Sequence, residues 1–436
     1  MSRRYLAIIA AITVSAMILA GLSFDWNIFS VGDHVDASKV YFATHISPAH
    51  KRVIELFNKE YKGRIEVIPV NLPFEKFTTN ERKELLARSL RSKSDRIDVF
   101  AVDLIWVPRF SKWCEPLEGY FTPEEKANIL SFALQSCYFE STLVAVPLYL
   151  DIGLMYYRRD LLSKLPDFPQ IEQKLRSSIS WDEFIALRDR VGYRNKPFYV
   201  FQADDYEGLV CNYFELIMGQ DKDFFRNNSV NLRSTTAKVA LQMMADFVHK
   251  INISPPRVTQ FDENQSYAYM LENDAIFVRG WPNFIESFST FYPDRDKLRS
   301  LGRAALPHFP GKRPASVYGG WNVMVSKFSP RKHAAVEFIK YLQKKETQEL
   351  LFDIGGYIPT NNDLYADSLY MSSHPGLQYY RTLLDFGFHR PAIVEYTKMS
   401  DIISYHVHHA IKGDIPVEQA LEQSTAMILS NKVLIK

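Results

Sequence analysis

The stretch KVYFATHISPAHKRVIELFNKEYKGRIEVIPV, residues 39–70, is the most informative part of the chain for its architecture. Its two ends, 39–43 and 64–70, are short runs rich in Val, Ile, Tyr and Phe, which is the composition of strands. Between them, Ser47 and the proline after it form a helix start, apolar residues follow at intervals of three and four, and Gly63 ends the helix. A strand, a helix and a strand in this order predict an α/β sheet.

The same alternation continues in the following residues. The segment FTTNERKELLARSLRSK (77–93) has helical periodicity, and we expect Leu85, Leu86 and Leu90 to face inward. The next segment, RIDVFAVDLIW (96–106), is nearly all apolar, as a parallel strand buried on both faces should be. Ligands of α/β sheets bind beyond the carboxyl ends of the strands, which is where this segment ends.

The middle of the chain differs from its beginning. Residues 164–300 are richer in helical patterns, and the alternation resumes at AALPHFPGKRPASVYGGWNVMVSK (304–327). A sheet pattern that is interrupted and then resumed predicts two lobes joined by several crossings, near Pro147, Pro307 and Pro359. We therefore expect an α/β protein in which each lobe is a sheet flanked by helices. The boundaries that we assign are 37–147 with 308–357 for lobe 1, and 148–307 with 358–436 for lobe 2.

The composition bears on the size of the protein and on its partners. A chain of 436 residues exceeds what one hydrophobic core usually serves, which also favours two lobes. Its 52 Lys and Arg residues nearly balance its 50 Asp and Glu residues, so no overall field favours nucleic acid. Aromatic residues make up 14% of the chain, which suits a ligand with flat faces but also an ordinary aromatic core.

The N-terminus has the pattern of an export signal. Arg3 and Arg4 precede an uncharged apolar run from Tyr5 to Phe24, which is also long enough to span a bilayer. No cysteine that would accept a lipid follows this run, and it has no clear cleavage site. We therefore expect residues 1–36 to hold a retained membrane anchor, with a removed signal peptide as the alternative. In both cases the body of the protein lies outside the cytoplasm, on the periplasmic or extracellular face.

Three cysteines are too few for a disulfide framework and lack the spacing of a metal site. In an oxidising compartment we expect one bridge, between Cys114 and Cys137, with Cys211 buried and free.

A histidine-rich run, SYHVHHAIKG, raises the question of a metal site. It places His406 and His409 on one helical face, but no carboxylate or cysteine ligand is evident beside them. We expect a surface helix that ends at Gly413, and neither a metal nor another cofactor.

Nine short segments carry a resemblance to a known family. They are DVFAVDLIW (98–106), VPLYLDIGLMYYRRDLL (146–162), DDYEGLVCNYFE (204–215), HKINISPP (249–256), FVRGWPN (277–283), LPHFPG (306–311), YGGWNV (318–323), GGYIPTNNDLY (355–365) and RPAIVEY (390–396). In these segments and in their order, the chain resembles the family 1 extracellular solute-binding proteins of ABC importers, particularly the maltose and trehalose binders. The resemblance extends from about residue 39 to the C-terminus.

This resemblance implies a two-lobed periplasmic-binding-protein fold of type II that closes on a sugar in the cleft between the lobes. It implies a monomer that is not an enzyme and that delivers a di- or oligosaccharide to the permease subunits of an ABC transporter. Carried over by position, the sugar-binding residues are Arg82, Asp103, Tyr149, Asp151, Trp281, Gly320, Trp321 and Arg390.

The residue types at these positions also suit a sugar on chemical grounds. The C–H faces of a sugar lie well on aromatic rings, and Asp and Arg side chains form charge-assisted hydrogen bonds with its hydroxyls. We expect Gly319 and Gly320 to bend the chain so that Trp321 forms the floor of the site, opposite Trp281 and outside the core. Glycine at position 320 would also leave its backbone N–H accessible to the ligand.

Several of these residues have a structural alternative. Asp103 could cap the helix that follows it, and Arg390 could form a structural ion pair. Trp281 could anchor a core, and Arg82 could lie on a solvated face. Glu207, in DDYEGL, also belongs to the resemblance but could equally hold a loop.

The chain departs from the family pattern in two places. Sugar binders of this type often carry an acid in the loop after the first strand, where this chain has THISPAH, with His45 and Ile46 near the place. One hydroxyl acceptor is therefore lost, which argues against maltose or trehalose itself as the ligand. The second departure is the missing lipid-accepting cysteine, whose role the N-terminal anchor would take.

Two other functions stay open at this point. A glycoside-processing enzyme would need a pair of carboxyl groups, for which Asp103 and Asp151 are the candidates, but the sequence supplies no apolar pocket for a proton donor. A membrane-tethered sensor would use the same cleft and report to a receptor instead of a permease. Neighbouring permease and ATPase genes would favour import.

Overall fold

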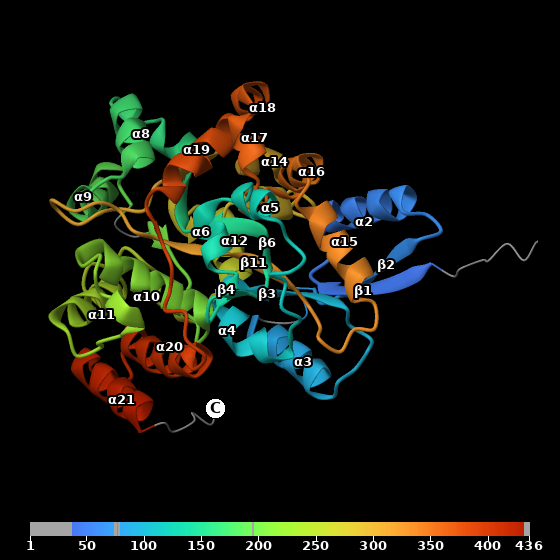
Figure 1. Cartoon of the computed structure of the whole chain (residues 1–436). Coiled ribbons are helices and arrows are strands. Elements are labelled where there is room, and N and C mark those ends of the chain that lie inside the picture. Colours follow the sequence, from blue (N-terminus) through green and yellow to red (C-terminus); the bar gives the residue numbers. More distant parts are fainter. Residues whose placement is uncertain (1–36, 74–75, 77–78, 194–195, 431–436) are drawn as a thin grey trace, which may run out of the picture.

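The computed structural model describes residues 37–430 except 74–75, 77–78 and 194–195 (Figure 1). The anchor predicted within residues 1–36 lies outside the described residues. In the part of the chain that is described, no helix is long and apolar enough to cross a membrane.

The larger sheet, which holds β1, β2, β3 and β11 of the first lobe, is mixed and has the strand order β12-β11-β3-β1-β2, and β6 also pairs with β11. The strands β1 (Ser38–Thr44), β2 (Ile65–Asn71) and β3 (Val99–Asp103) are parallel. In contrast, β11 (Ser316–Val325) is antiparallel to β3 and to β6 (Val146–Ile152). Every residue of β11 is buried, as in a central strand. The α/β sheet predicted from the alternating pattern is confirmed.

The helix α2 (Pro48–Glu60) begins where the sequence predicts it. The Ser47 hydroxyl oxygen accepts a hydrogen bond from the backbone N–H of His50 (3.4 Å) and so caps the first turn. On its inner face, the Phe57 ring packs edge-on against Phe338 of α15 (Lys332–Leu342), with ring centroids 5.1 Å apart. The apolar face of α2 thus covers the sheet together with α15.

The leucines predict the buried face of α3 (Thr79–Arg91) only in part. Leu86 is 1% exposed, but Leu85 is 40% exposed, so the expectation for Leu85 is wrong. The buried face instead includes Arg82 and Lys83, which are 1% and 2% exposed. An apolar pattern misses this face because two of its members are charged.

The second lobe is built on a sheet with the order β10-β7-β9-β8. The strand β7 (Leu154–Arg158) is antiparallel to β9 (Phe277–Gly280) and to β10 (Leu301–Ala304), and β8 (Tyr199–Val200) is parallel to β9. Four helices of this lobe pack together beside the sheet, at the lower left of Figure 1. They are α10 (Glu207–Gln220), α11 (Thr235–His249), α20 (Tyr396–Lys412) and α21 (Val417–Leu429).

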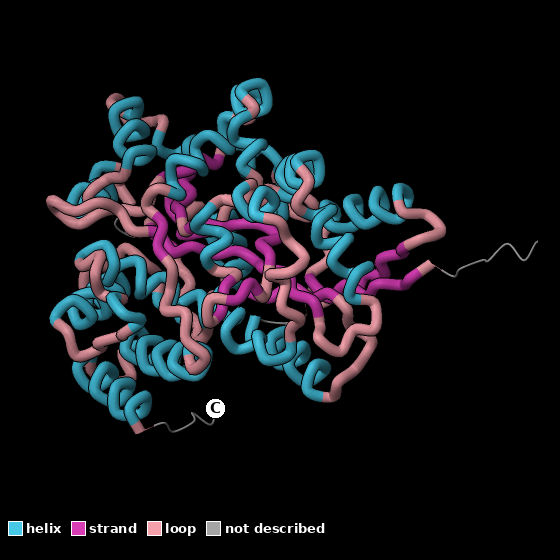
Figure 2. The backbone as a smooth tube through the Cα atoms, in the orientation of Figure 1, coloured by secondary structure: helices cyan, strands magenta, loops and turns pink. Residues whose placement is uncertain are grey.

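The chain passes between the two sheets more than once (Figure 2). The strand β6 leads through Gly153 directly into β7, and β10 leads through residues 305–315 into β11. A β-bridge between Leu150 and Ile358 brings a third segment to the same place. Two lobes joined in this way can close on each other by a hinge motion.

The other elements connect these layers. The remaining helices are α4 (Val107–Phe110), α5 (Pro123–Ala127), α6 (Ser131–Gln135), α7 (Arg159–Leu162), α8 (Phe168–Ser177), α9 (Trp181–Arg190), α12 (Glu263–Glu272), α13 (Phe284–Phe288), α14 (Arg295–Arg299), α16 (Lys345–Gly355), α17 (Asn362–Ala366), α18 (Ser368–Ser373) and α19 (Pro375–Leu384). The short strands are β4 (Tyr138–Phe139), β5 (Thr142–Leu143) and β12 (Gly387–Phe388).

The expected disulfide is wrong, because Cys114, Cys137 and Cys211 are all free and buried. The Cys114 thiol donates to the carbonyl of Phe110 (3.1 Å), whereas the Cys137 thiol lies 3.7 Å from the carbonyl of Ala133. Each thiol thus contacts the carbonyl of the residue four positions before it. The prediction that Cys211 is buried and unpaired is confirmed.

Candidate functional site

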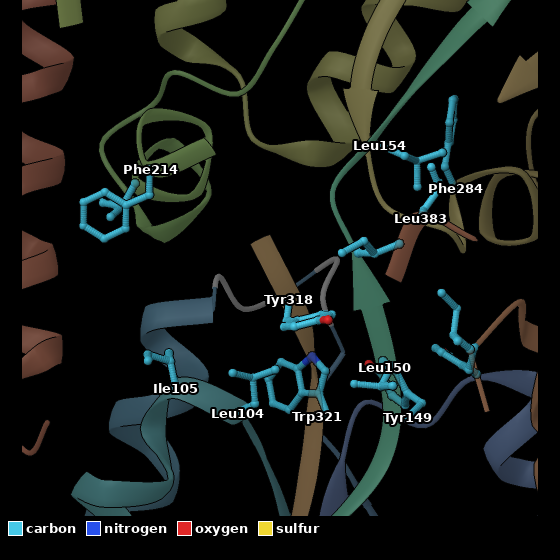
Figure 3. Close-up of a cluster of buried hydrophobic side chains, with 14 of the residues drawn as sticks. Leu104, Ile105, Tyr149, Leu150, Leu154, Phe214, Phe284, Tyr318, Trp321 and Leu383 are labelled. Carbon is cyan, nitrogen blue, oxygen red and sulfur yellow. The ribbon is translucent and has the colours of Figure 1, made fainter. Parts of the chain in front are cut away.

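The strand register brings three of the predicted site residues to one level of the first sheet. Trp321 on β11 lies opposite Asp103 at the end of β3 and opposite Tyr149 on β6. Figure 3 shows the indole with Leu104 on one side and Tyr149 on the other. In the strand register, Trp321 therefore lies between Asp103 and Tyr149, at the carboxyl end of β3.

Asp103 also has the capping role that was its alternative. Its carboxylate accepts a hydrogen bond from the backbone N–H of Ile105 (3.0 Å), which starts a 3₁₀ turn from Leu104 to Trp106. The turn fixes the side chain of Asp103 at the end of the strand.

Arg82 does not lie on a solvated face, because its side chain is packed against the predicted site. Its guanidinium carbon lies 4.2 Å from the centre of the Trp321 ring, and the Trp106 ring meets the same indole edge-on at 6.0 Å. Trp321 is 7% exposed and belongs to the hydrophobic core, so the expectation that it stands outside the core is wrong. Its contact with a sugar stays a prediction.

Arg390 connects the two lobes. It is 2% exposed, and its guanidinium donates to Asp103 Oδ1 on β3 (3.1 Å) and to Glu207 Oε1 on α10 (2.5 Å). The hydroxyls of Tyr396 and Ser400 also donate to the Glu207 carboxylate. The structural ion pair proposed as an alternative for Arg390 is confirmed. Glu207 holds Arg390 and the first turns of α20 to α10 within the second lobe, and the Arg390–Asp103 contact is the one that joins the lobes.

Asp151 is the acid least well paired in this region. Its Oδ1 atom is buried and has no hydrogen-bond partner among the described residues. Burial, and then the charge of Asp103, raise the pKa of the Asp151 carboxyl well above its usual range, against the opposing effect of Arg279. A hydroxyl-bearing ligand would supply the partner that this oxygen lacks.

Trp281 extends from the end of β9 in the second lobe. Its indole N–H donates to Glu263 Oε1 on α12 (3.2 Å), and the guanidinium carbon of Arg279 lies 3.9 Å from its ring centre. Arg279 in turn pairs with the buried carboxylate of Glu215 (2.7 Å). These contacts fix the orientation of a partly exposed indole.

The two glycines of YGGWNV are required by their neighbours. Gly320 has φ +124°, and a Cβ at this position would lie 2.4 Å from the carbonyl oxygen of Tyr149 on β6. A Cβ on Gly319 would lie 2.8 Å from the Trp281 ring. Position 320 therefore requires glycine because the backbone of β6 lies too close for a Cβ. The expected reason, access of a ligand to the Gly320 N–H, is a different one.

Three further residues at this site escaped the sequence analysis. Tyr357 packs against Tyr149 with ring centres 4.3 Å apart, and His50 packs against Tyr357 at 5.0 Å. Glu263 orients Trp281. The predicted start of α2 was the available signal for His50, because it puts this residue in a first turn beside the carboxyl ends of the strands.

The histidines of α20 have partners other than a metal. His406 is buried and its Nδ1 contacts the carbonyl of Ile402 (2.9 Å), whereas His409 pairs with Asp414 (2.7 Å). The helix ends with Gly413 in the left-handed conformation, as predicted. Within the described range, no three His, Cys, Asp or Glu side chains are placed to hold a metal ion.

A family model described as bacterial extracellular solute-binding protein matches residues 42–349. A curated relative, a probable ABC transporter-binding protein of Deinococcus radiodurans, is 25% identical over 345 residues, which cover 76% of this chain and 79% of the relative.

Solved structures with the same architecture extend over nearly the whole chain. A maltose-bound T. maritima MalE3 superposes with a TM-score of 0.80 and 27% identity, covering 91% of this chain and 100% of that one. A solute-binding protein from Thermotoga lettingae bound with α-D-tagatose gives a TM-score of 0.76 and 21% identity, covering 90% and 99%. The GacH receptor of Streptomyces glaucescens, studied with acarbose, gives 0.75 and 18%, covering 91% and 100%, and at this identity it shows the fold alone.

Proposed function

The chain belongs to the bacterial extracellular solute-binding protein family, and from this premise we propose that it binds a di- or oligosaccharide in the interlobe cleft and delivers it to an ABC permease. The observation that carries the proposal is the register that sets Trp321 between Asp103 and Tyr149. The maltose-bound and curated relatives support the same function.

The geometry suggests how a sugar would be held. Trp281 and Tyr149 offer aromatic faces to the C–H surfaces of the sugar ring, and the unpaired oxygen of Asp151 would accept a hydrogen bond from a sugar hydroxyl. Arg82 fixes Trp321 from one side. We assign no catalytic step to Asp103, because its carboxylate is already engaged by Arg390 and by the N–H of Ile105.

Closure of the lobes is the second part of the proposal. A ligand shifts the protein toward the closed form only through contacts that are better there than in the open form. In this structure Arg390 already joins carboxylates of both lobes. We propose that the moving bodies are 37–147 with 308–357 and 148–307 with 358–436, and that the permease recognises the closed pair. An N-terminal anchor would hold this protein on the outer side of the membrane.

Isothermal titration of the purified protein with a panel of di- and oligosaccharides tests the function. Replacing Trp281 by alanine should weaken binding of a panel member about ten- to a hundred-fold, since it removes one large aromatic contact. Trp113→Ala, a partly exposed tryptophan outside the site, is the matched control and should bind normally. Absence of binding across the panel contradicts the proposal, and release of reducing sugar from an oligosaccharide would instead support an enzyme.

A further inference from the structure

The N-terminus of α2 lies beside the proposed sugar site. His50 is the third residue of this helix, and its ring centre is 5.0 Å from that of Tyr357 and 6.3 Å from that of Tyr149. The His50 side chain therefore lies next to Tyr149, the β6 residue that pairs with Trp321 in the strand register.

The imidazole of His50 has one satisfied nitrogen and one unsatisfied nitrogen. Its Nδ1 lies 2.9 Å from the Ser47 hydroxyl, whereas Nε2 is buried and has no hydrogen-bond partner among the residues that the structure describes. His50 itself is 3% exposed. A buried polar nitrogen without a partner is costly, and a ligand atom would satisfy it.

The charges around His50 are basic. Burial, and after it the charges of His45 and Arg82, lower the pKa of His50 to about 3. At Asp151, the neighbouring charges that raise the pKa are Asp103 and Glu263. Tyr149 lies between the two regions: apart from burial, which raises the pKa of its hydroxyl, the charge of Asp151 also raises this pKa and the charge of Arg82 lowers it. The site thus has a basic end at α2 and an acidic end at Asp151.

A helix N-terminus also favours a negative charge. The aligned peptide dipoles of α2, a helix of 13 residues, place a partial positive charge at its first turn. His50 lies in that turn, and its free Nε2 would donate to an anion when it carries the proton, with Nδ1 accepting from the Ser47 hydroxyl.

We propose that the saccharide bound by this protein carries an acidic group, a carboxylate, phosphate or sulfate, and that this group binds at the N-terminus of α2, beside Arg82 and in contact with His50 Nε2. The inference rests on the proposed sugar-binding function and specifies its substrate class.

Matched pairs of neutral and acidic saccharides provide the test. The purified chain is titrated calorimetrically with galactobiose and digalacturonate, maltose and maltobionate, trehalose and trehalose 6-phosphate, and unsulfated and sulfated chondroitin disaccharide. We expect at least one acidic member to bind about ten- to a hundred-fold more tightly than its neutral partner, as a charge-assisted hydrogen bond predicts. The pair in which the acidic member binds more tightly shows whether the acidic group is a carboxylate, a phosphate or a sulfate.

Two variants locate the acidic group. His50→Phe keeps a ring against Tyr357 but removes the donor, and it should reduce the preference for the acidic member about ten-fold. Lys51→Gln removes a charge from the exposed face of the same turn and should leave the preference unchanged. If His50→Phe does not fold, an unchanged preference in Lys51→Gln still shows that the preference does not come from general electrostatic attraction to the exposed face of this turn.

The outcomes separate this inference from the function on which it rests. Neutral members that bind as tightly as the acidic ones, or a preference lost in Lys51→Gln, would overturn the inference and leave sugar binding intact. Failure of every saccharide, neutral or acidic, would overturn the proposed function and the inference together.

Discussion

Replacing Arg390 with methionine would leave two acids of different lobes without the cation that they share. The side chain of Arg390 is 1% exposed and that of Glu207 is 9% exposed, so the carboxylate of Glu207 would keep a buried charge or take up a proton. Breaking a buried ion pair from one side costs about 3–5 kcal/mol, because the partner charge stays desolvated. We expect Arg390→Met to lower the free energy of unfolding of the ligand-free protein by about this amount.

A double-mutant cycle with Glu207→Gln isolates the interaction. Glu207→Gln leaves Arg390 with Asp103 as its partner, whereas Arg390→Met leaves Glu207 and Asp103 without their cation. The loss at Asp103 is common to the single and the double Arg390 variant and cancels in the cycle, so the two effects should fall short of additivity by more than about 1 kcal/mol. Urea unfolding followed by tryptophan fluorescence measures all four proteins. Arg226→Met, which removes an exposed pair with Asp223, is the control and should change stability little. Additive effects, or an Arg390→Met protein as stable as the wild type, would refute the reasoning.

Four other outcomes are expected. Gly320→Ala should destabilise the protein by at least about 2 kcal/mol in thermal or urea unfolding, since a Cβ there meets the backbone of β6, whereas Gly119→Ala, with open space around it, should be nearly neutral. Alkylation of the denatured, unreduced protein should add three labels by mass spectrometry, and fewer would restore a disulfide. Burial lowers the pKa of His50 to about 3 and that of His389 to about 4, so below the unfolded pKa of about 6.5 the unfolded chain binds more protons than the folded chain. The free energy of unfolding should therefore decrease as the pH is lowered from about 6.5 to about 4, by up to about 2.7 kcal/mol per pH unit, in unfolding curves measured across this range. The N-terminal apolar run should keep the intact protein in the membrane fraction, and a soluble mature chain that begins near residue 22 would show cleavage instead.

Local signals predicted the parts of the fold that depend on neighbouring residues in the chain. Ser47 and Pro48 marked the start of α2, Gly413 marked the end of α20, and the apolar run before Asp103 marked a buried strand. Each of these features follows from backbone dihedral preferences, from capping groups within a few residues, or from hydrophobic periodicity. These local signals were sufficient to predict the alternating strand–helix pattern and the two lobes.

The amino-acid sequence by itself therefore determined the elements, the α/β class and the set of residue types available for a sugar site. Only the tertiary structure decided which partners those residues have. Arg390 joins Asp103 to Glu207, Leu85 faces solvent, and Cys114 and Cys137 remain apart. The physical reason is that hydrogen bonds, ion pairs and thiol contacts act over a few ångströms between segments far apart in the chain, so their partners depend on packing and not on local pattern.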